Sequence, residues 1–516
     1  MKNQIIKGTF ILSAAGILTR MIGFYYRIFL SNTIGATGMG LYQMIFPMYG
    51  LCISFAVTGI QMAISKYVAA GYAKKDYHGI LGILKAGLSV SLYLSIFISF
   101  LLYLFSGFIA ENMIGDIRCQ HLLKLAAYAI PFCAIHGCIT GYFLGKSQTI
   151  VPAIAQLFEQ LSRVGIVYLI AFAAASDGEY LSPDAAMAGL FLGEFTSAFV
   201  CVCALIKESF TLKRCPGNTY ASENNDIITE TNYHKQILKL SYPLAFGRVI
   251  TSIISSSEAV LILYCLKKYG LSHDESIRIY GVLTGMAMPF IFFPSTITGA
   301  ISAMILPSVS ESESSGNYVK IARTTATVVR YCFSIGIFFA ALFYIYGYDI
   351  GIVLFHDADA GTFISILSWL CPFMYLGSTL SSILNGLGLT KITFGINVSV
   401  SLSRVAFLWL LVPLCGIRGY LWGILISQII SAFLLLFFVK KHTHFRYDIR
   451  ECIILPCFIT VLCMIPALAT DYLVNYFVDI PLLTLGADIC VASGLFALLL
   501  FRPQIIYKLL KPFEPK

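Results

Sequence analysis

Two arginines stand inside the first apolar run of the sequence. Residues 10–30 read FILSAAGILTRMIGFYYRIFL, a stretch long enough to cross a bilayer, and it contains Arg20 and Arg27. An arginine at the centre of a lipid-facing helix costs between ~2.5 and ~17 kcal/mol, so such residues usually face a bundle interior or a water-filled cavity. Because guanidinium groups match phosphate and carboxylate oxygens, these arginines predict a site for an anion such as a phosphate or pyrophosphate.

Further charged residues stand in later apolar runs at similar depth. Arg248 lies about twelve residues into a predicted seventh helix, with Ser252 and Ser255 at helical spacing, so we place it with Arg20 and Arg27 in the anion site. The other intramembrane charges are candidates for lining the cavity or for binding a coupling ion or proton: Glu159, Arg163, Glu194, Glu258, Arg330 and Arg404.

A structural role is the competing interpretation of several of these charges. Glu159 precedes Arg163 by four residues, a spacing at which the two side chains of a helix form an ion pair. Arg330 has two possible acidic partners in other spans, Glu194 and Glu258. Either kind of pair would neutralise an arginine without any ligand.

Composition identifies an integral membrane protein. Of the 516 residues, 58% are hydrophobic and only 12% are charged, whereas soluble domains carry roughly 25% charged residues. The long apolar runs predict α-helices and not a β-barrel. No segment between them exceeds about 30 residues, which leaves no separate domain for nucleic acid despite the net charge of +9.

Enzymatic and metal chemistry find little support in the sequence. No GxSxG or HExxH motif occurs, and the fifteen cysteines form no Cys-x-x-Cys pair. His136, alone in a predicted fourth span, is interpreted as a satisfied interior residue. We therefore expect no enzyme, no resident cofactor, no metal site and no disulfide framework, with coupling to the membrane potential, H⁺ or Na⁺ left open.

The apolar runs predict about fourteen transmembrane helices with an internal repeat. LSRV at 161–164 recurs at 402–405, an offset of 241 residues that also relates Gly145 to Gly386, and it makes Arg163 and Arg404 equivalent. The prediction is an all-α membrane protein of two six-helix lobes related by a parallel repeat, an arrangement typical of alternating-access transporters. The predicted parts are an N-terminal lobe at 1–206, a cytoplasmic linker at 207–235, a C-terminal lobe at 236–439, and two extra helices with a cytoplasmic tail at 440–516.

The distribution of basic residues predicts the orientation in the membrane. Counting from an uncleaved first span with its N-terminus inside, the cytoplasmic segments hold 21 Lys and Arg residues and the outer loops hold 6. Both termini are therefore expected in the cytoplasm. The outer loop 267–278 departs from this bias, since it carries Lys267, Lys268 and Arg278.

Several motifs resemble a known family of exporters. KGTFILSAAGILTRMIGF, IGATGMGLYQMIFPMYGL, TGIQMAISKYVA and GYFLGKSQ…LFEQLSRV are similar to the stage V sporulation protein B family. That family is part of the polysaccharide-transporter branch of the multidrug/oligosaccharidyl-lipid/polysaccharide exporter (MOP) superfamily, to which multidrug (MATE) exporters also belong. The resemblance covers essentially the whole chain and is most distinctive over the first 170 residues.

The resemblance implies a flippase in the bacterial inner membrane. Such proteins carry undecaprenyl-pyrophosphate-linked saccharides for peptidoglycan synthesis and, in endospore formers, for the spore cortex. Related lipid II flippases place arginines of the first, second and seventh helices in a central cavity. By motif, Arg20 and Arg27 match the first-helix arginines and Arg248 matches the seventh, whereas the second-helix stretch GLCISFAVTG has no basic counterpart.

The expected partners are the lipid-linked saccharide, membrane lipid and cell-wall synthesis enzymes, and nucleic acid is not expected. Two other functions remain open from the sequence. One is a cation-coupled multidrug exporter of the same superfamily, which would need an acidic cavity in the first half. The other is a scaffold that recruits cell-wall synthesis enzymes without transporting anything.

Overall fold

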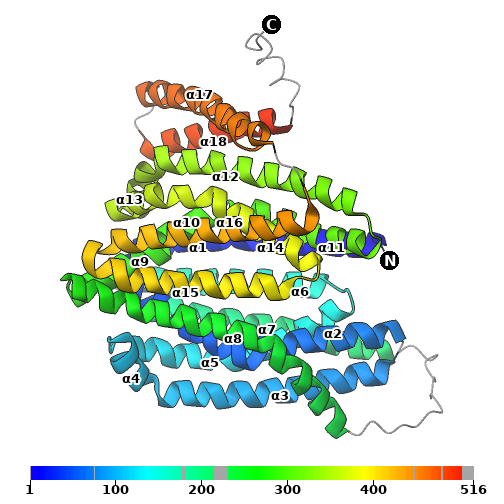
Figure 1. Cartoon of the computed structure of the whole chain (residues 1–516). Helices are drawn as coiled ribbons and strands as arrows, with labels where there is room; N and C mark the ends of the chain where they lie inside the picture. Colours follow the sequence, from blue (N-terminus) through cyan, green and yellow to red (C-terminus); the bar gives the residue numbers. More distant parts are fainter. Residues whose placement is uncertain are drawn as a thin grey trace. The chain divides into compact units, whose positions relative to one another are not determined.

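All regular elements in the described part of the chain are helices (Figure 1). The structure is a computed structural model that describes residues 2–74, 76–176, 181–213, 230–445, 448–477 and 480–501. The all-helical membrane architecture predicted from composition is therefore confirmed. Most of the predicted linker 207–235 and the predicted tail beyond residue 501 lie outside the described residues.

The helices pack into two compact units, Met1–Gly281 and Val282–Lys516. The helices of the first unit are α1 (Lys2–Ile53), α2 (Gly59–Lys74), α3 (Tyr77–Leu104), α4 (Ser106–Phe108), α5 (Cys119–Gly145), α6 (Ile150–Ser176), α7 (Pro183–Lys213), α8 (Glu230–Tyr269) and α9 (His273–Gly281). Those of the second are α10 (Met288–Phe292), α11 (Ser295–Ser314), α12 (Tyr318–Phe355), α13 (Ala358–Leu367), α14 (Cys371–Gly386), α15 (Thr390–Cys415), α16 (Ile417–Thr443), α17 (Leu455–Phe477) and α18 (Pro481–Phe501). Short π-helical or 3₁₀ turns join some of them, at Ser54–Thr58, Ile109–Ile114, Val282–Ala287, Ser368–Leu370 and Arg450–Ile454.

The number of membrane-spanning segments agrees with the prediction of about fourteen. Twelve helices of the described residues are long and apolar enough to cross a membrane, and a bent pair, His273–Phe292 with Ser295–Ser314, makes a thirteenth span. One of the twelve, Ala14–Lys74, has 61 residues. At 1.5 Å per residue it is about 90 Å long, three times the ~30 Å of a bilayer core. Gly35 divides it, because its φ of 70° and ψ of 177° break the helix, and this division supplies the fourteenth span.

The internal repeat is visible in how each unit packs. In the first unit α5 packs on α2, α3 and α7, and in the second α14 packs on α11, α12 and α16. Gly145 ends α5 where a Cβ would lie 2.6 Å from the Ser65 carbonyl oxygen, and Gly386 ends α14 where a Cβ would lie 2.9 Å from that of Leu306. Both pairs differ by 241 residues, so the same tight crossing of two helices occurs in each lobe.

Helix ends and core residues follow the same offset. Asp76 caps α3 by accepting a hydrogen bond from the Gly79 backbone N–H, and Asn317 caps α12 by accepting one from that of Lys320. Each core contains an equivalent set of buried residues: Val68, Ile139, Tyr142 and Phe143 in the first unit, and Val309, Leu380, Ile383 and Leu384 in the second. The parallel repeat predicted from short sequence matches is therefore present at the level of caps and core packing.

The boundary between the compact units does not coincide with the predicted end of the first lobe. By the repeat, α8 begins the second half, yet it packs on α1, α2 and α3 of the first unit. Ser252 of α8 lies 2.8 Å from the hydroxyl oxygen of Ser54, and a Cβ on Gly59 would lie 2.6 Å from the Ser241 carbonyl oxygen. Repeat and packing thus divide the chain at different places.

A polar cluster in the first unit joins the loop that precedes α5 to the first turn of α9. The carboxylate of Asp116 accepts hydrogen bonds from the Arg118 backbone N–H at 2.8 Å and from its guanidinium Nη2 at 2.7 Å. His273 Nε2 lies 3.1 Å from the same carboxylate, and Arg118 also binds Asp274. Burial alone would raise the pKa of Asp116, but the hydrogen bonds and charge of Arg118, with a smaller contribution from His273, hold it below its usual range. The basic loop 267–278 therefore has an acidic neighbour.

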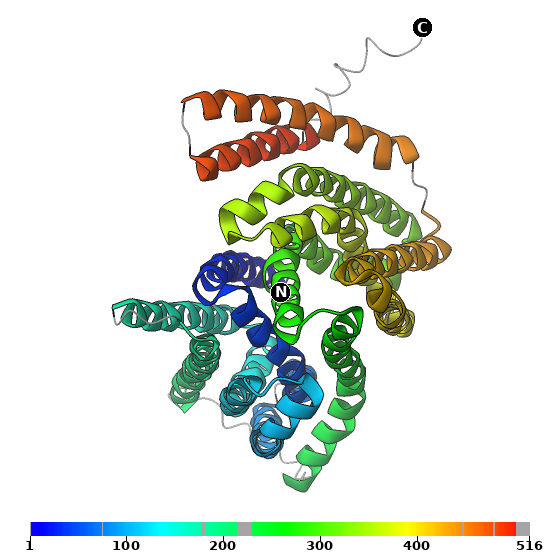
Figure 2. The same cartoon turned by 90° about the vertical axis from the view of Figure 1, so that its left-hand side faces the viewer.

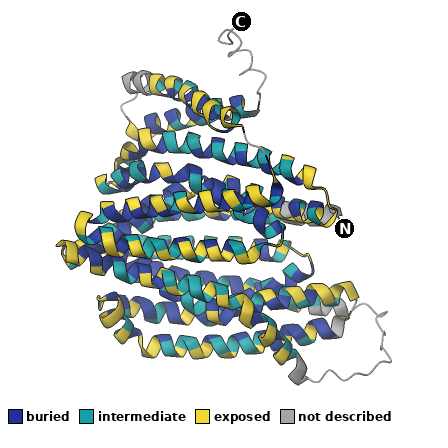
Figure 3. Ribbon diagram, viewed as in Figure 1, coloured by how far each residue is buried: buried dark blue, intermediate teal, exposed yellow. Residues whose placement is uncertain are grey.

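Large apolar side chains are exposed on the repeat-equivalent helices α6 and α15. Exposed residues are yellow in Figure 3, where they recur along α15. Phe172 of α6 is 78% exposed and Leu414 of α15 is 75% exposed. Contact between such apolar faces and water is unfavourable. Exposed apolar patches of this kind are typical of interaction or membrane surfaces. In the second unit α17 and α18, which lie outside the repeat, pack side by side (Figures 1 and 2).

Candidate functional site

The three arginines predicted to bind the anion all belong to the first compact unit. Arg20 and Arg27 are on α1 before the break at Gly35, and Arg248 is on α8. Arg20 and Arg248 are exposed, while Arg27 is partly buried. Because α8 packs with the first unit, all three candidate arginines lie within the same compact unit.

Helix α1 packs against α6 through side chains that neighbour its arginines in the sequence. The hydroxyl groups of Tyr25 and Tyr168 are 2.8 Å apart, and the ring of Phe29 stacks on Tyr168 with centroids 4.0 Å apart. A Cβ on Gly23 would lie 3.2 Å from the side-chain nitrogen of Gln160, so glycine permits a close approach there. These contacts fix the α1 segment that carries Arg20 and Arg27.

Arg27 also shares surroundings with Arg163 of α6. The two guanidinium charges act on one another, and both act on the hydroxyl of Tyr42. Arg163 in turn forms an ion pair with Glu159 one helical turn earlier, with 2.9 Å between Nη2 and Oε1. The predicted Glu159–Arg163 pair is confirmed, and because it is neutral as a whole it adds no net charge beside Arg27.

Arg248 lies on the side of α8 near the α1–α2 junction. Four residues later on the same helical face, Ser252 contacts Ser54 of the π-helical turn that follows α1. Ser256 donates a hydrogen bond to the Pro47 carbonyl oxygen of α1 at 3.0 Å. Hydroxyl groups therefore position the segment of α8 that bears Arg248, while Ser255 is exposed.

Arg330 forms an ion pair, as predicted, but its partner is neither of the two predicted residues, Glu194 and Glu258. Its Nη1 donates a hydrogen bond to Glu451 Oε2 at 2.8 Å, which joins α12 to the π-helical turn Arg450–Ile454 within the second unit. The predicted pairing with Glu194 is wrong, because the carboxylate of Glu194 faces His136 and Tyr49. A partner 121 residues away, in the part of the chain outside the repeat, could not be read from helical spacing.

The remaining candidates occupy both units. Glu258 is buried on α8, and Arg404 is partly buried on α15 at the position equivalent to Arg163 on α6. Arg404 has no acid four residues before it, because Val400 stands where Glu159 precedes Arg163. The charge pair of α6 is therefore not repeated in α15.

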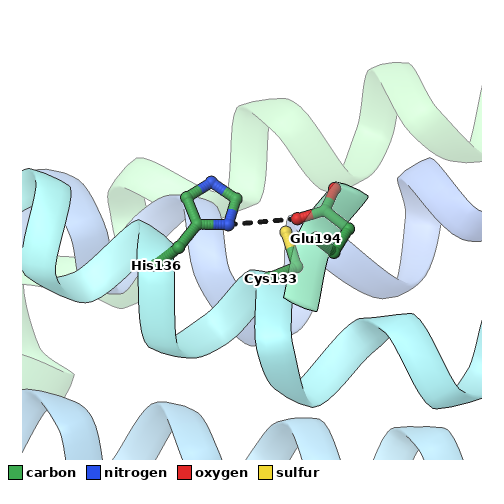
Figure 4. A group of neighbouring side chains, drawn as sticks. All are labelled: Cys133, His136 and Glu194. Carbon is green, nitrogen blue, oxygen red and sulfur yellow. Dashed lines mark ion pairs between the residues drawn. The ribbon is translucent and has the colours of Figure 1, made fainter. Parts of the chain in front are cut away.

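The sequence did not reveal a second polar cluster beside Glu159 and Arg163. Glu194 of α7 is 6% exposed, and one of its oxygens accepts a hydrogen bond from the Tyr49 hydroxyl at 3.3 Å. Its other oxygen lies 3.0 Å from His136 Nδ1, with Cys133 alongside (Figure 4). The available signal was the spacing Cys133-x-x-His136, which places both side chains on one face of α5.

Comparison with known proteins agrees with this architecture. The family model described as "Polysaccharide biosynthesis protein" matches residues 5–313. Stage V sporulation protein B of Bacillus subtilis is 26% identical over 453 residues, which are 87% of this chain and 86% of that protein. Lipid II flippase MurJ of Bacillus subtilis is 24% identical over 487 residues, which are 87% of this chain and 85% of that protein.

Solved structures show the same fold. A structure of lipid II flippase MurJ in an inward closed conformation superposes with a TM-score of 0.71 at 15% identity, covering 96% of this chain and all of that one. An inward-facing MATE-family multidrug transporter of the MOP superfamily gives a TM-score of 0.63 at 14% identity, covering 83% and 94% of the two chains. With more than half of its length matched by the family model, the chain belongs to the polysaccharide biosynthesis protein family.

Proposed function

We propose that this protein is a flippase for a lipid-linked oligosaccharide and that Arg20, Arg27 and Arg248 bind the pyrophosphate of its substrate. The observation that carries the proposal is the presence of these three arginines on apolar helices of one compact unit. Relatives that are named a sporulation protein and a lipid II flippase support it. The substrate class is a polyprenyl-pyrophosphate saccharide, such as a peptidoglycan precursor for the cell wall or the spore cortex.

The main barrier to flipping is the transfer of a diphosphate through hydrocarbon. An isolated ion in such a medium loses solvation worth tens of kcal/mol, so some polar group must replace water along its path. Arginine is suited to this role because it stays charged and presents parallel N–H donors to phosphate oxygens. The glycan would occupy an aqueous cavity while the polyprenyl tail stays in lipid, and the lobes would expose the cavity to each side in turn.

The other intramembrane charges have different proposed roles. Arg163 is balanced by Glu159, so the pair lines the site without adding net charge. Arg330 is bound to Glu451 and holds α12 in the second unit. Glu194 and Glu258 are the buried carboxylates through which an ion gradient could act, and Arg404 is a further candidate for lining the cavity.

The proposed setting is the bacterial inner membrane with both termini in the cytoplasm. The excess of Lys and Arg in the predicted inner loops supports this orientation. Cell-wall synthesis enzymes are the proposed protein partners, because they make and consume substrates of this class on the two sides of that membrane.

Reconstitution tests the proposal directly. Purified protein in liposomes would be supplied with a panel of fluorescent polyprenyl-pyrophosphate saccharides, and transfer between leaflets would be measured. We expect R20A and R248A to abolish transfer while the protein remains folded, and R323A, at an exposed arginine of α12, to transfer normally. Wild-type transfer by both R20A and R248A would refute the site.

The fold shared with a multidrug exporter favours one alternative, a cation-coupled drug exporter. Such a protein should confer drug resistance that depends on a sodium or proton gradient, whereas a flippase should not. The three arginines oppose this alternative, because they would repel a cationic drug. Flipping by the purified protein alone would also exclude a scaffold that only recruits other proteins.

A further inference from the structure

Three potential ligand atoms converge between α5 and α7 in the first unit (Figure 4). Cys133 and His136 project from one face of α5, and Glu194 projects towards them from α7. The Sγ atom, an imidazole nitrogen and a carboxylate oxygen all lie within 4.8 Å of one another. Cys133 is 7% exposed and Glu194 is 6% exposed, so the group is enclosed by protein.

Two of these atoms face each other as an ion pair. His136 Nδ1 and Glu194 Oε2 are 3.0 Å apart, and no other group within the described residues donates a hydrogen bond to that oxygen. The other oxygen of Glu194 is held by the Tyr49 hydroxyl, which directs Oε2 into the space beside Cys133.

We propose that Cys133, His136 and Glu194 form a site for a divalent metal ion of the Zn²⁺ type. A thiolate, an imidazole nitrogen and a carboxylate are the ligands that zinc uses, whereas Na⁺ and Mg²⁺ prefer oxygen ligands throughout. Three protein ligands leave a fourth position for water. The side chain of His136 is 20% exposed, which gives an ion a way in.

The local charges suit such an ion. On binding, the Cys133 thiol loses its proton to solvent, so the thiolate and the Glu194 carboxylate together balance the two charges of the metal. His136 binds as the neutral imidazole. The nearest other charges, Glu159 and Arg163, neutralise each other in their ion pair. A bound metal therefore leaves no net charge in this buried region.

Metal binding would join three helices of the first unit. Two ligands belong to α5 and one to α7, and the Tyr49 hydroxyl of α1 supports the carboxylate from the other side. Because the ion would bind the folded protein and not the unfolded chain, it should raise the stability of this unit. The site is separate from the proposed pyrophosphate ligands, so either proposal can fail without the other.

Cobalt absorption of the purified protein tests the site. After removal of metals, titration with Co²⁺ should produce a thiolate-to-cobalt charge-transfer band that saturates at one equivalent and disappears on addition of Zn²⁺. The melting temperature should rise by several degrees with either metal. Absence of the band in the wild-type protein would overturn the proposal whatever the variants do.

Matched variants assign the ligands. C133S should lose the band, whereas C138S, at a buried cysteine of the same helix whose Sγ contacts the Gly87 carbonyl oxygen, should keep it. H136Q and E194Q should weaken Co²⁺ binding at least tenfold, while H121Q, at an exposed histidine of α5, should not. A band that survives in C133S, or a cluster that responds to pH but binds no cobalt, would refute the metal site.

Discussion

Asp116 is expected to contribute most to the stability of the polar cluster that it forms with Arg118, His273 and Asp274 in the first unit. Its side chain is 4% exposed, it accepts hydrogen bonds from the Arg118 guanidinium and backbone N–H, and His273 Nε2 lies 3.1 Å from one of its oxygens. In D116N the shape is kept, but the amide nitrogen replaces one acceptor and faces the donors of Arg118. One or two hydrogen bonds to a charged group are then lost.

The expected loss follows from the exposure of the partners. Each hydrogen bond to a charged group contributes about 1.5–3 kcal/mol. Arg118 is 47% exposed, so water replaces part of what it loses, and the total should be about 1.5–3 kcal/mol. For a unit of this size that corresponds to a fall in melting temperature of roughly 2–5 °C, measured by thermal unfolding of the purified protein in detergent.

Asp274 supplies a matched control. It contacts the same Arg118, but its side chain is 71% exposed, so D274N should change stability by no more than about 1 kcal/mol. Equal losses in D116N and D274N, or no loss in D116N, would show that burial of the carboxylate does not determine its contribution.

The same pair predicts a pH dependence. Because the pKa of Asp116 is below its usual value in the folded protein, its contribution is present above the unfolded pKa of about 3.9 and is lost as the pH falls through the lower folded value. The difference in melting temperature between wild type and D116N should therefore be constant from neutral pH to about pH 5 and shrink below pH 4. A difference that changes between pH 5 and 8 would point to another group.

Two further substitutions test helix packing by thermal unfolding and by gel filtration. In G281A the added Cβ would lie 2.4 Å from the Gly40 backbone nitrogen, so we expect a loss of about 3 kcal/mol, whereas G165A, with no atom within 4 Å, should stay within about 1 kcal/mol of wild type. A tolerated G281A would contradict the close approach of α1 and α9. The buried hydroxyl of Tyr375 donates a hydrogen bond to the Ile291 carbonyl oxygen at 2.9 Å. Y375F removes this donor, so we expect the free energy of unfolding to fall by about 1–3 kcal/mol. An unchanged free energy of unfolding would show that water reaches that carbonyl.

Much of the fold could be predicted because its signals are local. Apolar run lengths gave the helices, and a few matches at one offset predicted a repeat that the equivalent crossings at Gly145 and Gly386 confirm. The prediction of about fourteen spans counts the first long apolar stretch as two, and the structure breaks that stretch at Gly35. The sequence did not show that helix continues directly on both sides of this one residue, because glycines in an apolar run predict a longer connection.

The candidate site was predicted where spacing along one helix was sufficient. The Glu159–Arg163 pair lies within one turn of α6 and followed directly from the sequence. The contact between His136 and Glu194 depends on which faces of α5 and α7 meet, and Arg330 meets Glu451 through packing far along the chain. Helical periodicity predicts which residues share one face of a helix, but it does not predict which neighbouring helix that face packs against.

The position of α8 has a consequence for the origin of this architecture. Helix α8, which covers α2, corresponds to the leading helix of the second half. If the two halves descend from one duplicated ancestor, a single ancestral chain therefore had no helix of its own to cover the surface of α2. A half-length protein could have covered that surface only by receiving the leading helix of another molecule, as swapped dimers do. Fusion of the two genes would then have made this one contact between subunits a permanent part of a single chain.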